Sequence, residues 1–243
     1  MTNKEAIIYY TGREYTSPKF GTLKIIEYVN NTNITVQFSE GYVLKTRIND
    51  LILGSIKNLY WPSVYGVGYV GIGKYNTSYK RAYSVWAGML QRCYDEGYQI
   101  KKPTYKGVTV CEEWHNFQNF AAWFEQNYVE GWELDKDIIC PNCKIYSQET
   151  CCFVPRELNI LFSKRQNKVA KNTGVIEKDN KYHPYIRVNC TTKLLGVCGT
   201  LEEAQNKYKK AKKEQALNMA EKWKGLVDNR VYEALINFKV YTR

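Results

Sequence analysis

The sequence predicts an α+β fold: a small N-terminal antiparallel β-barrel, a central helical region, and a C-terminal three-stranded sheet followed by a helix. Three observations lead to this prediction. Short apolar runs separated by Asn and Gly turns open the chain, the apolar period lengthens to three or four residues after position 81, and three strand-like runs precede a capped helix after position 174. Such periods distinguish strands from helices. The 243 residues suffice for several small domains. We place the segments at 1–62, 63–80, 81–165 and 166–243.

The first predicted domain, residues 1–62, consists of short apolar runs and turns. The runs cover residues 23–29, 34–38, 42–48 and 51–56. Short strands at this spacing are typical of a small antiparallel β-barrel, here an interaction or spacer module. Residues 63–80 are rich in Gly and Tyr but lack the Gly-Lys-Ser/Thr of a phosphate loop. We therefore expect them to form a linker or an arm that wraps around a neighbouring domain.

The positive charge of the chain is large and unevenly distributed. Lys plus Arg number 35 against 24 Asp plus Glu, and residues 164–213 hold 13 basic and 4 acidic side chains. Phosphate neutralisation supplies most non-specific affinity for nucleic acid, so this excess predicts a polyanion partner; a solvated helix face over 207–213 is the alternative. The sequence contains no apolar run of about 18 residues and no export signal, which predicts a protein without a membrane span in a reducing cytoplasm.

Two amphipathic helices are predicted in the central region. Trp86, Met89, Leu90 and Cys93 recur at three-to-four spacing within residues 81–95. A second apolar stripe covers residues 114–124 and follows a short strand at 107–110. A histidine, His115, lies beside this second stripe rather than in its centre, which favours an exposed or partly satisfied ring over a catalytic or metal-binding one.

The eight cysteines are expected to be buried thiols or metal ligands, because disulfides are rare in a reducing compartment. Cys140 and Cys143 have the Cys-x-x-Cys spacing at which two thiolates around a tight turn can share one zinc ion. A complete zinc site needs two more ligands, and buried thiols in a Pro-Asn turn are the alternative. The candidate additional ligands are Cys93, Cys111, His115, Cys151 and Cys152.

Four motifs lie in order between residues 81 and 165. They are WxxMLxRCY from Trp86, YxGVxVCxEWxxFxxFxxW from Tyr105, LDKDI from Leu134, and YSxETCxFVPxxxN from Tyr146. Together they resemble the phage-borne HNH homing-endonuclease family. The resemblance implies a β-hairpin followed by a helix, the ββα-metal motif, which holds one divalent cation such as Mg²⁺ for cleavage of double-stranded DNA.

The resemblance also assigns roles to individual residues. It places Asp135 at the metal-binding Asp and Asn159 at the metal-binding position on the helix. Lys136 stands where the family has the histidine that takes a proton from the attacking water. A lysine ammonium is protonated at neutral pH and suits a phosphate clamp better than a general base. Asp137 is the remaining candidate for the base or for a second metal ligand, and a solvated strand end is the alternative for all three charged neighbours.

A second resemblance covers residues 169–222, which look like the three-stranded APETALA-type DNA-binding domain. Strands are predicted at 174–177, 182–188 and 193–198, and Thr200 and Glu203 form a capping box before a helix that ends near residue 223. Such a sheet can enter the major groove with one face while its helix packs on the other. An ordinary solvated sheet is the alternative. The predicted DNA-contacting residues on the exposed face are Lys181, Tyr185, Arg187 and Lys193, with Arg187 positioned for guanine.

Three functions of different classes are compatible with these patterns. The first is a phage-type modular DNA-binding protein of HNH-endonuclease descent in which nuclease activity is weakened or lost. The second is an active metal-dependent nicking or homing endonuclease. The third is a phage interaction protein that inhibits a host nuclease or defence complex. All three place the protein in the cytoplasm of an infected bacterium, and double-stranded DNA is the partner expected for the first two.

Overall fold

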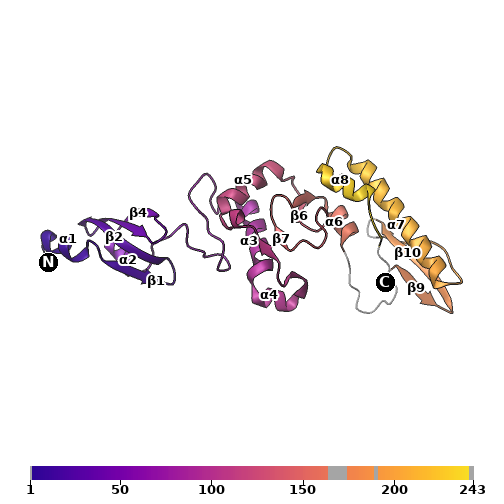
Figure 1. Cartoon of the computed structure of the whole chain (residues 1–243), viewed down its shortest axis with the longest axis horizontal. Coiled ribbons are helices and arrows are strands. Elements are labelled where there is room, and N and C mark those ends of the chain that lie inside the picture. Colours follow the sequence, from indigo (N-terminus) through magenta and orange to yellow (C-terminus); the bar gives the residue numbers. More distant parts are fainter. Residues whose placement is uncertain (1, 164–173, 189–190, 241–243) are drawn as a thin grey trace. The chain divides into compact units, whose positions relative to one another are not determined.

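The computed structural model describes residues 2–163, 174–188 and 191–240 (Figure 1). The fold is α+β with several small sheets, none of which is closed among the described residues. The chain divides into two compact units. The first contains Met1–Gln126 and Lys144–Ser147, and the second contains Asn127–Cys143 and Gln148–Arg243. The basic side chains that the sequence places in 164–173 lie outside the described residues.

The N-terminal sheet has four antiparallel strands in the order β1-β2-β3-β4. Its core buries the apolar side chains of alternate strand positions, among them Leu23, Ile25 and Val36. A helix precedes the sheet and a shorter one follows it. The elements are α1 (Asn3–Tyr10), β1 (Glu14–Ser17), β2 (Gly21–Asn30), β3 (Asn33–Phe38), β4 (Val43–Thr46) and α2 (Ile48–Ile52).

The predicted closure of this sheet into a barrel is not confirmed, because the described sheet is open. Residues 51–56 were expected to be a strand, but the chain forms helix α2 there and then a turn. Ile48 and Leu51, three residues apart, are both buried, whereas the neighbouring Ile52 and Leu53 are 68% and 74% exposed. Apolar residues three apart fit one helical face and do not fit strand alternation.

Residues 63–80 pack on the start of α5 (Phe117–Asn127), in the manner of a wrapping arm. The Tyr69 N–H donates to the carbonyl oxygen of His115, and the Phe117 N–H donates to that of Tyr69, both at 2.9 Å. The Gln118 amide donates to two carbonyl oxygens of the arm, at 2.9 and 2.6 Å. A Cβ on Gly68 would lie 2.4 Å from a methyl carbon of Leu90, so glycine permits this close approach.

The central helices of the first unit surround α3 (Lys80–Tyr94), and its predicted helical period is confirmed. The apolar face of α3 buries Trp86, Met89 and Leu90, and the Trp86 indole N–H donates to the carbonyl oxygen of Trp114 at 2.6 Å. Strands β5 and β7 pair in parallel beside these helices. The remaining elements of this region are α4 (Glu96–Lys101), η1 (Pro103–Tyr105), β5 (Thr109–Val110), η2 (Glu112–His115) and β7 (Ile145–Tyr146).

The second unit has a core to which residues on both sides of position 165 contribute. Strands β6 (Glu133–Asp135) and β8 (Cys152–Val154) pair antiparallel and are followed by α6 (Arg156–Phe162). Helix α6 packs against α7 (Leu201–Trp223) and α8 (Asn229–Ile236), as Figure 1 shows. The buried side chains of this core are Ile138, Cys152, Val154, Leu158, Leu161, Ala216, Ala220, Val231 and Leu235.

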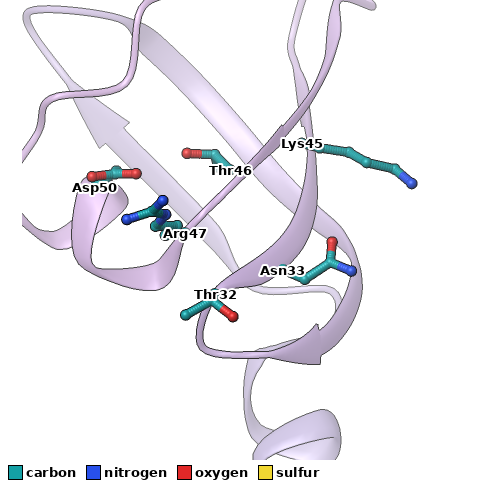
Figure 2. Close-up of a pocket in the computed structure, with 6 residues that line it drawn as sticks. All are labelled: Thr32, Asn33, Lys45, Thr46, Arg47 and Asp50. Atoms are coloured by element: carbon teal, nitrogen blue, oxygen red, sulfur yellow. The ribbon is translucent and has the colours of Figure 1, made fainter.

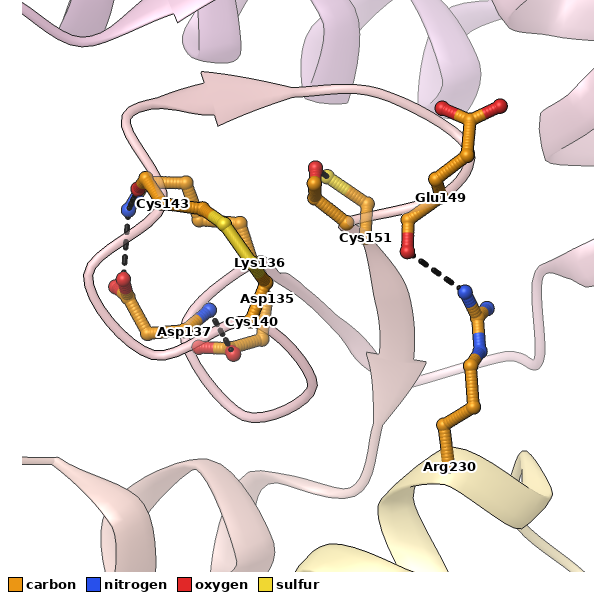
Figure 3. The surroundings of a disulfide bond; sticks show 9 residues. Asp135, Lys136, Asp137, Cys140, Cys143, Glu149, Cys151 and Arg230 are labelled. Carbon is orange, nitrogen blue, oxygen red and sulfur yellow. Dashed lines mark hydrogen bonds and ion pairs between the residues drawn. A yellow bond between two sulfur atoms is a disulfide. The ribbon is translucent and has the colours of Figure 1, made fainter.

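Polar contacts reinforce the packing of these helices. The Glu157 carboxylate accepts from the Lys222 ammonium at 2.6 Å and from the Trp223 indole N–H at 2.7 Å. The Arg230 guanidinium donates to the carbonyl oxygen of Glu149 at 2.7 Å, which attaches α8 to the segment before β8 (Figure 3). Because both contacts join segments far apart in the sequence, α6, α7 and α8 form one packed assembly.

The C-terminal sheet of the same unit has three antiparallel strands in the order β11-β10-β9. They are β9 (Val175–Lys178), β10 (Lys181–Val188) and β11 (Thr191–Leu194). Helix α7 begins where the sequence predicts, with the Thr200 hydroxyl accepting from the Glu203 N–H at 3.2 Å. Val175 and Ala204 are buried together, so α7 covers one face of the sheet and leaves the other open. Among the described residues, no helix has both the length and the apolar character needed to cross a membrane.

Candidate functional site

Asp135 ends β6 with its carboxylate turned back onto the chain. Its Oδ1 accepts from the N–H groups of Asp137 and Ile138, each at 2.8 Å, which closes a tight turn after the strand; Figure 3 shows the bond from Asp137. Burial raises the pKa of the Asp135 carboxyl, and the nearby Asp137 adds to this effect. The carboxylate therefore has a structural use, because it satisfies two main-chain donors at the start of the turn.

Lys136, at the position where the resemblance predicts a histidine, is held by acceptors on both sides. Its Nζ donates to Asp137 Oδ1 at 2.6 Å and to the carbonyl oxygen of Cys143 at 2.9 Å. Lys136 is only 7% exposed, whereas the side chain of Asp137 is 63% exposed. Figure 3 shows this ion pair beside the Cys140–Cys143 bond. A lysine ammonium has three N–H donors and no lone pair, so it cannot accept a proton from water.

Asn159 lies on α6 and contacts a different carboxylate from the one that the resemblance pairs it with. Its Nδ2 donates to Glu133 Oε2 at 2.7 Å, and Glu133 is two residues before Asp135 on β6. Among the described residues, no group of three or more His, Cys, Asp or Glu side chains is placed to hold a metal ion. The divalent cation at Asp135 and Asn159 stays a prediction.

Cys140 and Cys143 are joined by a disulfide, which the sequence analysis did not predict. The pair closes a turn in which Asn142 has a positive φ of 74°, a conformation that Asn tolerates better than most residues. In this oxidised form neither sulfur is a thiolate, so zinc binding at these two residues requires their reduction. Burial also raises the pKa of the Cys152 thiol well above its ordinary range, which makes Cys152 a packing residue and a poor metal ligand.

The hairpin between β9 and β10 determines which side chains share the open face of the C-terminal sheet. Asp179 and Asn180 form a two-residue loop with φ values of 53° and 54°, so that Lys178 pairs directly with Lys181. Directly opposite residues point to the same face, and residues two apart along a strand do so as well. Lys181, Tyr185 and Arg187 therefore lie on one face. The opposite face buries Pro184 and Ile186 beneath α7.

The open face also presents residues that the sequence analysis did not identify. Lys178 faces Lys181, and two like charges directly opposite each other destabilise a strand pair unless an anion lies near them. Leu194 pairs with Tyr185 and is 60% exposed, and Ile176 pairs with His183 and is 48% exposed. The two-residue loop was the signal that could have revealed Lys178, since it determines the pairing. We call Lys178, Lys181, Tyr185 and Arg187 the basic sheet face.

Lys193 does not share this face in the observed register. It pairs with Ile186, which is buried on the side covered by α7, so its Cβ lies on that side of the sheet. The sequence alone does not give the pairing of β11 (Thr191–Leu194) with β10, and in the observed register Thr192, not Lys193, lies opposite Arg187. Lys193 is exposed at the edge of the sheet.

Comparisons with protein-family models, curated proteins and solved structures found no match to this chain. A small hollow occurs beside β4 and α2 in the first unit (Figure 2). Its lining residues are all exposed or half-buried: Thr32, Asn33, Lys45, Thr46, Arg47 and Asp50. None of the predicted catalytic, metal-binding or DNA-contacting residues lines this hollow.

The raised pKa of Asp135 has a measurable consequence for stability. A carboxyl whose pKa is raised by folding adds stability at low pH, and that stability is lost as the pH rises through the folded-state pKa. Asp135→Asn keeps an oxygen to accept both main-chain N–H groups but carries no charge. At pH 7 we expect the melting temperature of the variant to be a few degrees above that of the wild type, which is the shift that a change of ~1 kcal/mol in unfolding free energy produces. Near pH 4 the two melting temperatures should be equal.

Melting curves of both proteins at pH 4, 5.5 and 7 measure this difference. Asp179→Asn, in an exposed turn, is the matched control and should leave the pH profile of melting unchanged. A variant that is less stable than the wild type at pH 7, or a difference that is independent of pH, would show that the Asp135 charge is compensated.

Proposed function

We propose that this protein binds double-stranded DNA through the basic sheet face, and that its ability to cleave DNA is weakened or absent. The observation that carries the proposal is the joint placement of Lys178, Lys181, Tyr185 and Arg187 on the face of the sheet that α7 does not cover. Two strands of a sheet fit within the major groove of B-DNA, and an Arg in that position can donate two hydrogen bonds to guanine.

The chemistry of the face suits a duplex in two further ways. Lys178 and Lys181 repel each other across the hairpin, and a phosphate between them would relieve that repulsion. The exposed Leu194 and Ile176 provide apolar contacts of the kind that thymine methyl groups accept. A protein partner would also accept apolar contacts, but it would not require the paired cations; the combination therefore favours DNA.

The cleavage part of the proposal rests on Lys136. General-base catalysis requires a group that can take a proton from water at neutral pH, and the family's histidine is that group. Here the corresponding amine donates to Asp137 and to the Cys143 carbonyl, and it holds the turn that follows Asp135. Asp137 is exposed and accepts from this amine, and a carboxylate is a weaker general base at neutral pH than a histidine.

Binding is tested by the affinity of the full chain for a labelled duplex between 50 and 200 mM salt. We expect the affinity to fall steeply as salt rises, with a logarithmic slope of about 0.9 for each phosphate contacted. The absence of duplex binding, or an affinity that does not change with salt, would contradict the proposal and favour an interaction with another protein.

Cleavage is tested with supercoiled plasmid in the presence of Mg²⁺ or Mn²⁺. We expect the plasmid to remain supercoiled, because no general base replaces the histidine. Nicks that require the metal and disappear in Asp135→Ala would show an active nuclease, and they would leave the binding part of the proposal intact.

A further inference from the structure

Four exposed lysines gather around η1 and β5 in the first unit, and we call them the lysine cluster: Lys101, Lys102, Lys106 and Lys144. Lys101 ends α4, Lys102 precedes η1, and Lys106 follows it. Lys144 is distant in the sequence and directly precedes β7. Its carbonyl oxygen accepts from the N–H of Thr109 at 2.7 Å, which holds it beside β5.

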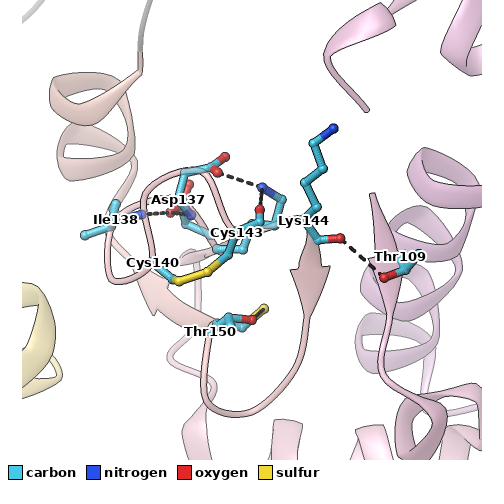
Figure 4. A network of polar contacts seen from close by, with 10 residues as sticks. Thr109, Asp137, Ile138, Cys140, Cys143, Lys144 and Thr150 are labelled. Atoms are coloured by element: carbon cyan, nitrogen blue, oxygen red, sulfur yellow. Dashed lines mark hydrogen bonds and ion pairs between the residues drawn. A yellow bond between two sulfur atoms is a disulfide. The ribbon is translucent and has the colours of Figure 1, made fainter. Parts of the chain in front are cut away.

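The Lys144 side chain extends over Gly107, the neighbour of Lys106. A Cβ on Gly107 would lie 3.7 Å from the Lys144 Nζ, and Gly107 has a φ of +74°, where glycine is favoured. Figure 4 shows the Lys144 carbonyl bonded to Thr109 while its ammonium projects away from the polar residues drawn. The β5–β7 pairing thus brings a fourth cation next to a group of three that are close in sequence.

The four lysines of the cluster form no ion pair with any carboxylate among the described residues. Acidic residues flank this stretch at Glu96, Glu112 and Glu113, but among the described residues none of them forms an ion pair with a lysine of the cluster. The negative end of the α4 dipole favours Lys101 and the C-cap Lys102, but it does not reach Lys106 or Lys144. Clustered cations without counter-charges repel one another, and a polyanion removes this repulsion.

A fixed aromatic framework supports the cluster. The Tyr105 ring lies on η1 between Lys102 and Lys106, with the Arg92 guanidinium 6.0 Å from its centroid. The same guanidinium lies 5.6 Å from the centroid of the buried Tyr146 ring. Arg92 therefore lies against residues of both η1 and β7, which Lys102, Lys106 and Lys144 flank in the sequence. Packed side chains thus hold together the backbone segments from which these lysines project.

We propose that the lysine cluster is a second DNA-contacting surface, which binds the phosphate backbone of a duplex without reading its sequence. This inference rests on the proposed function, since it takes the same duplex as the ligand. The cluster offers ammonium groups and no guanidinium fork exposed for base edges; ammonium groups act on phosphate as point charges. It lies in the first unit, whereas the basic sheet face belongs to the second.

The test compares three full-length proteins on one random-sequence duplex over a range of salt. The first variant changes all four lysines of the cluster to glutamine. The second is a matched control with the same loss of charge from exposed lysines of the N-terminal sheet region: Lys4, Lys19, Lys24 and Lys57 to glutamine. We expect the cluster variant to bind roughly 10- to 100-fold more weakly at 0.15 M salt, with a salt slope lower by about 3, and the control to change little.

The outcomes separate this inference from the proposed function. A further variant, in which Lys178, Lys181 and Arg187 of the basic sheet face are changed to alanine, completes the series. If the cluster variant binds like the control while this sheet-face variant loses affinity, the inference is wrong and the proposed function stands. If the wild type does not bind duplex at all, or binds only vesicles rich in phosphatidylserine, both are wrong. Circular dichroism and thermal melting show whether each variant is folded. If the fourfold variant unfolds, the double variant Lys106→Gln/Lys144→Gln replaces it, with an expected salt slope of binding lower by about 1 to 2.

Discussion

Changing Lys178, Lys181 and Arg187 together to alanine is expected to weaken duplex binding about 100- to 1,000-fold at 0.15 M salt. The two lysines would each lose a phosphate contact, which lowers the salt slope by about 1 per residue. Arg187 would lose hydrogen bonds to a base, worth about 1–3 kcal/mol for a good bidentate pair. Arg187→Ala alone should relax the preference at one base pair and leave the affinity for random duplex less affected.

The control for this prediction removes the same number of positive charges from other places in the C-terminal module. Lys193, Lys210 and Lys213 are exposed; the first is on the α7 side of the sheet, and the other two are on α7. Their joint replacement by alanine should weaken binding several-fold at most, through the general field of the protein. Equal losses in the two triple variants would mean that net charge alone attracts the duplex and that the sheet face has no special role.

Leu158→Ala is expected to destabilise the second unit by about 2–5 kcal/mol. Leu158 is fully buried, and it lies on α6 in the core that α6 forms with α7 and α8. The truncation leaves a cavity lined by helices from distant parts of the sequence, so these helices should lose stability together. Trp132 and Trp223 lie 5.8 Å apart in the same unit, and their fluorescence during urea unfolding reports on this change.

Ile160→Ala is the matched control for Leu158→Ala. Ile160 is two residues away on α6 and is 45% exposed, so its truncation should cost less than about 1 kcal/mol. If Leu158→Ala is no more destabilising than Ile160→Ala, α6 does not share a cooperative core with the C-terminal helices.

The helices were the part of this fold that local sequence patterns described best. The three-to-four spacing of Trp86, Met89 and Leu90 predicted α3, and Thr200 with Glu203 predicted the start of α7. Each of these signals depends on residues within a few positions of one another. The same local logic failed at residues 51–56, where apolar content suggested a strand and the chain forms α2, which leaves the sheet open.

The contacts of the candidate site depend on pairing between distant segments, which a pattern along one segment does not contain. The bond between Asn159 and Glu133 follows from the way α6 packs on β6. The contacts of Lys136 with Asp137 and Cys143 follow from the turn that the Cys140–Cys143 disulfide closes. The sequence analysis did not predict this disulfide, because it assumed a reducing compartment. The side of the sheet on which Lys193 lies follows from its pairing with Ile186, which the sequence of β11 alone does not contain.

The central claim is that the basic sheet face touches the duplex, and photo-cross-linking measures that contact directly. Tyr185 lies at the centre of the face, and replacing it with p-benzoylphenylalanine keeps an aromatic ring at that position. Tyr9 on α1 is 52% exposed and serves as the control for an exposed tyrosine elsewhere. We predict that irradiation couples the protein labelled at position 185 to duplex DNA and that the protein labelled at position 9 remains uncoupled. Coupling at position 9 but not at 185, or at neither position under conditions where the duplex is bound, would contradict the claim.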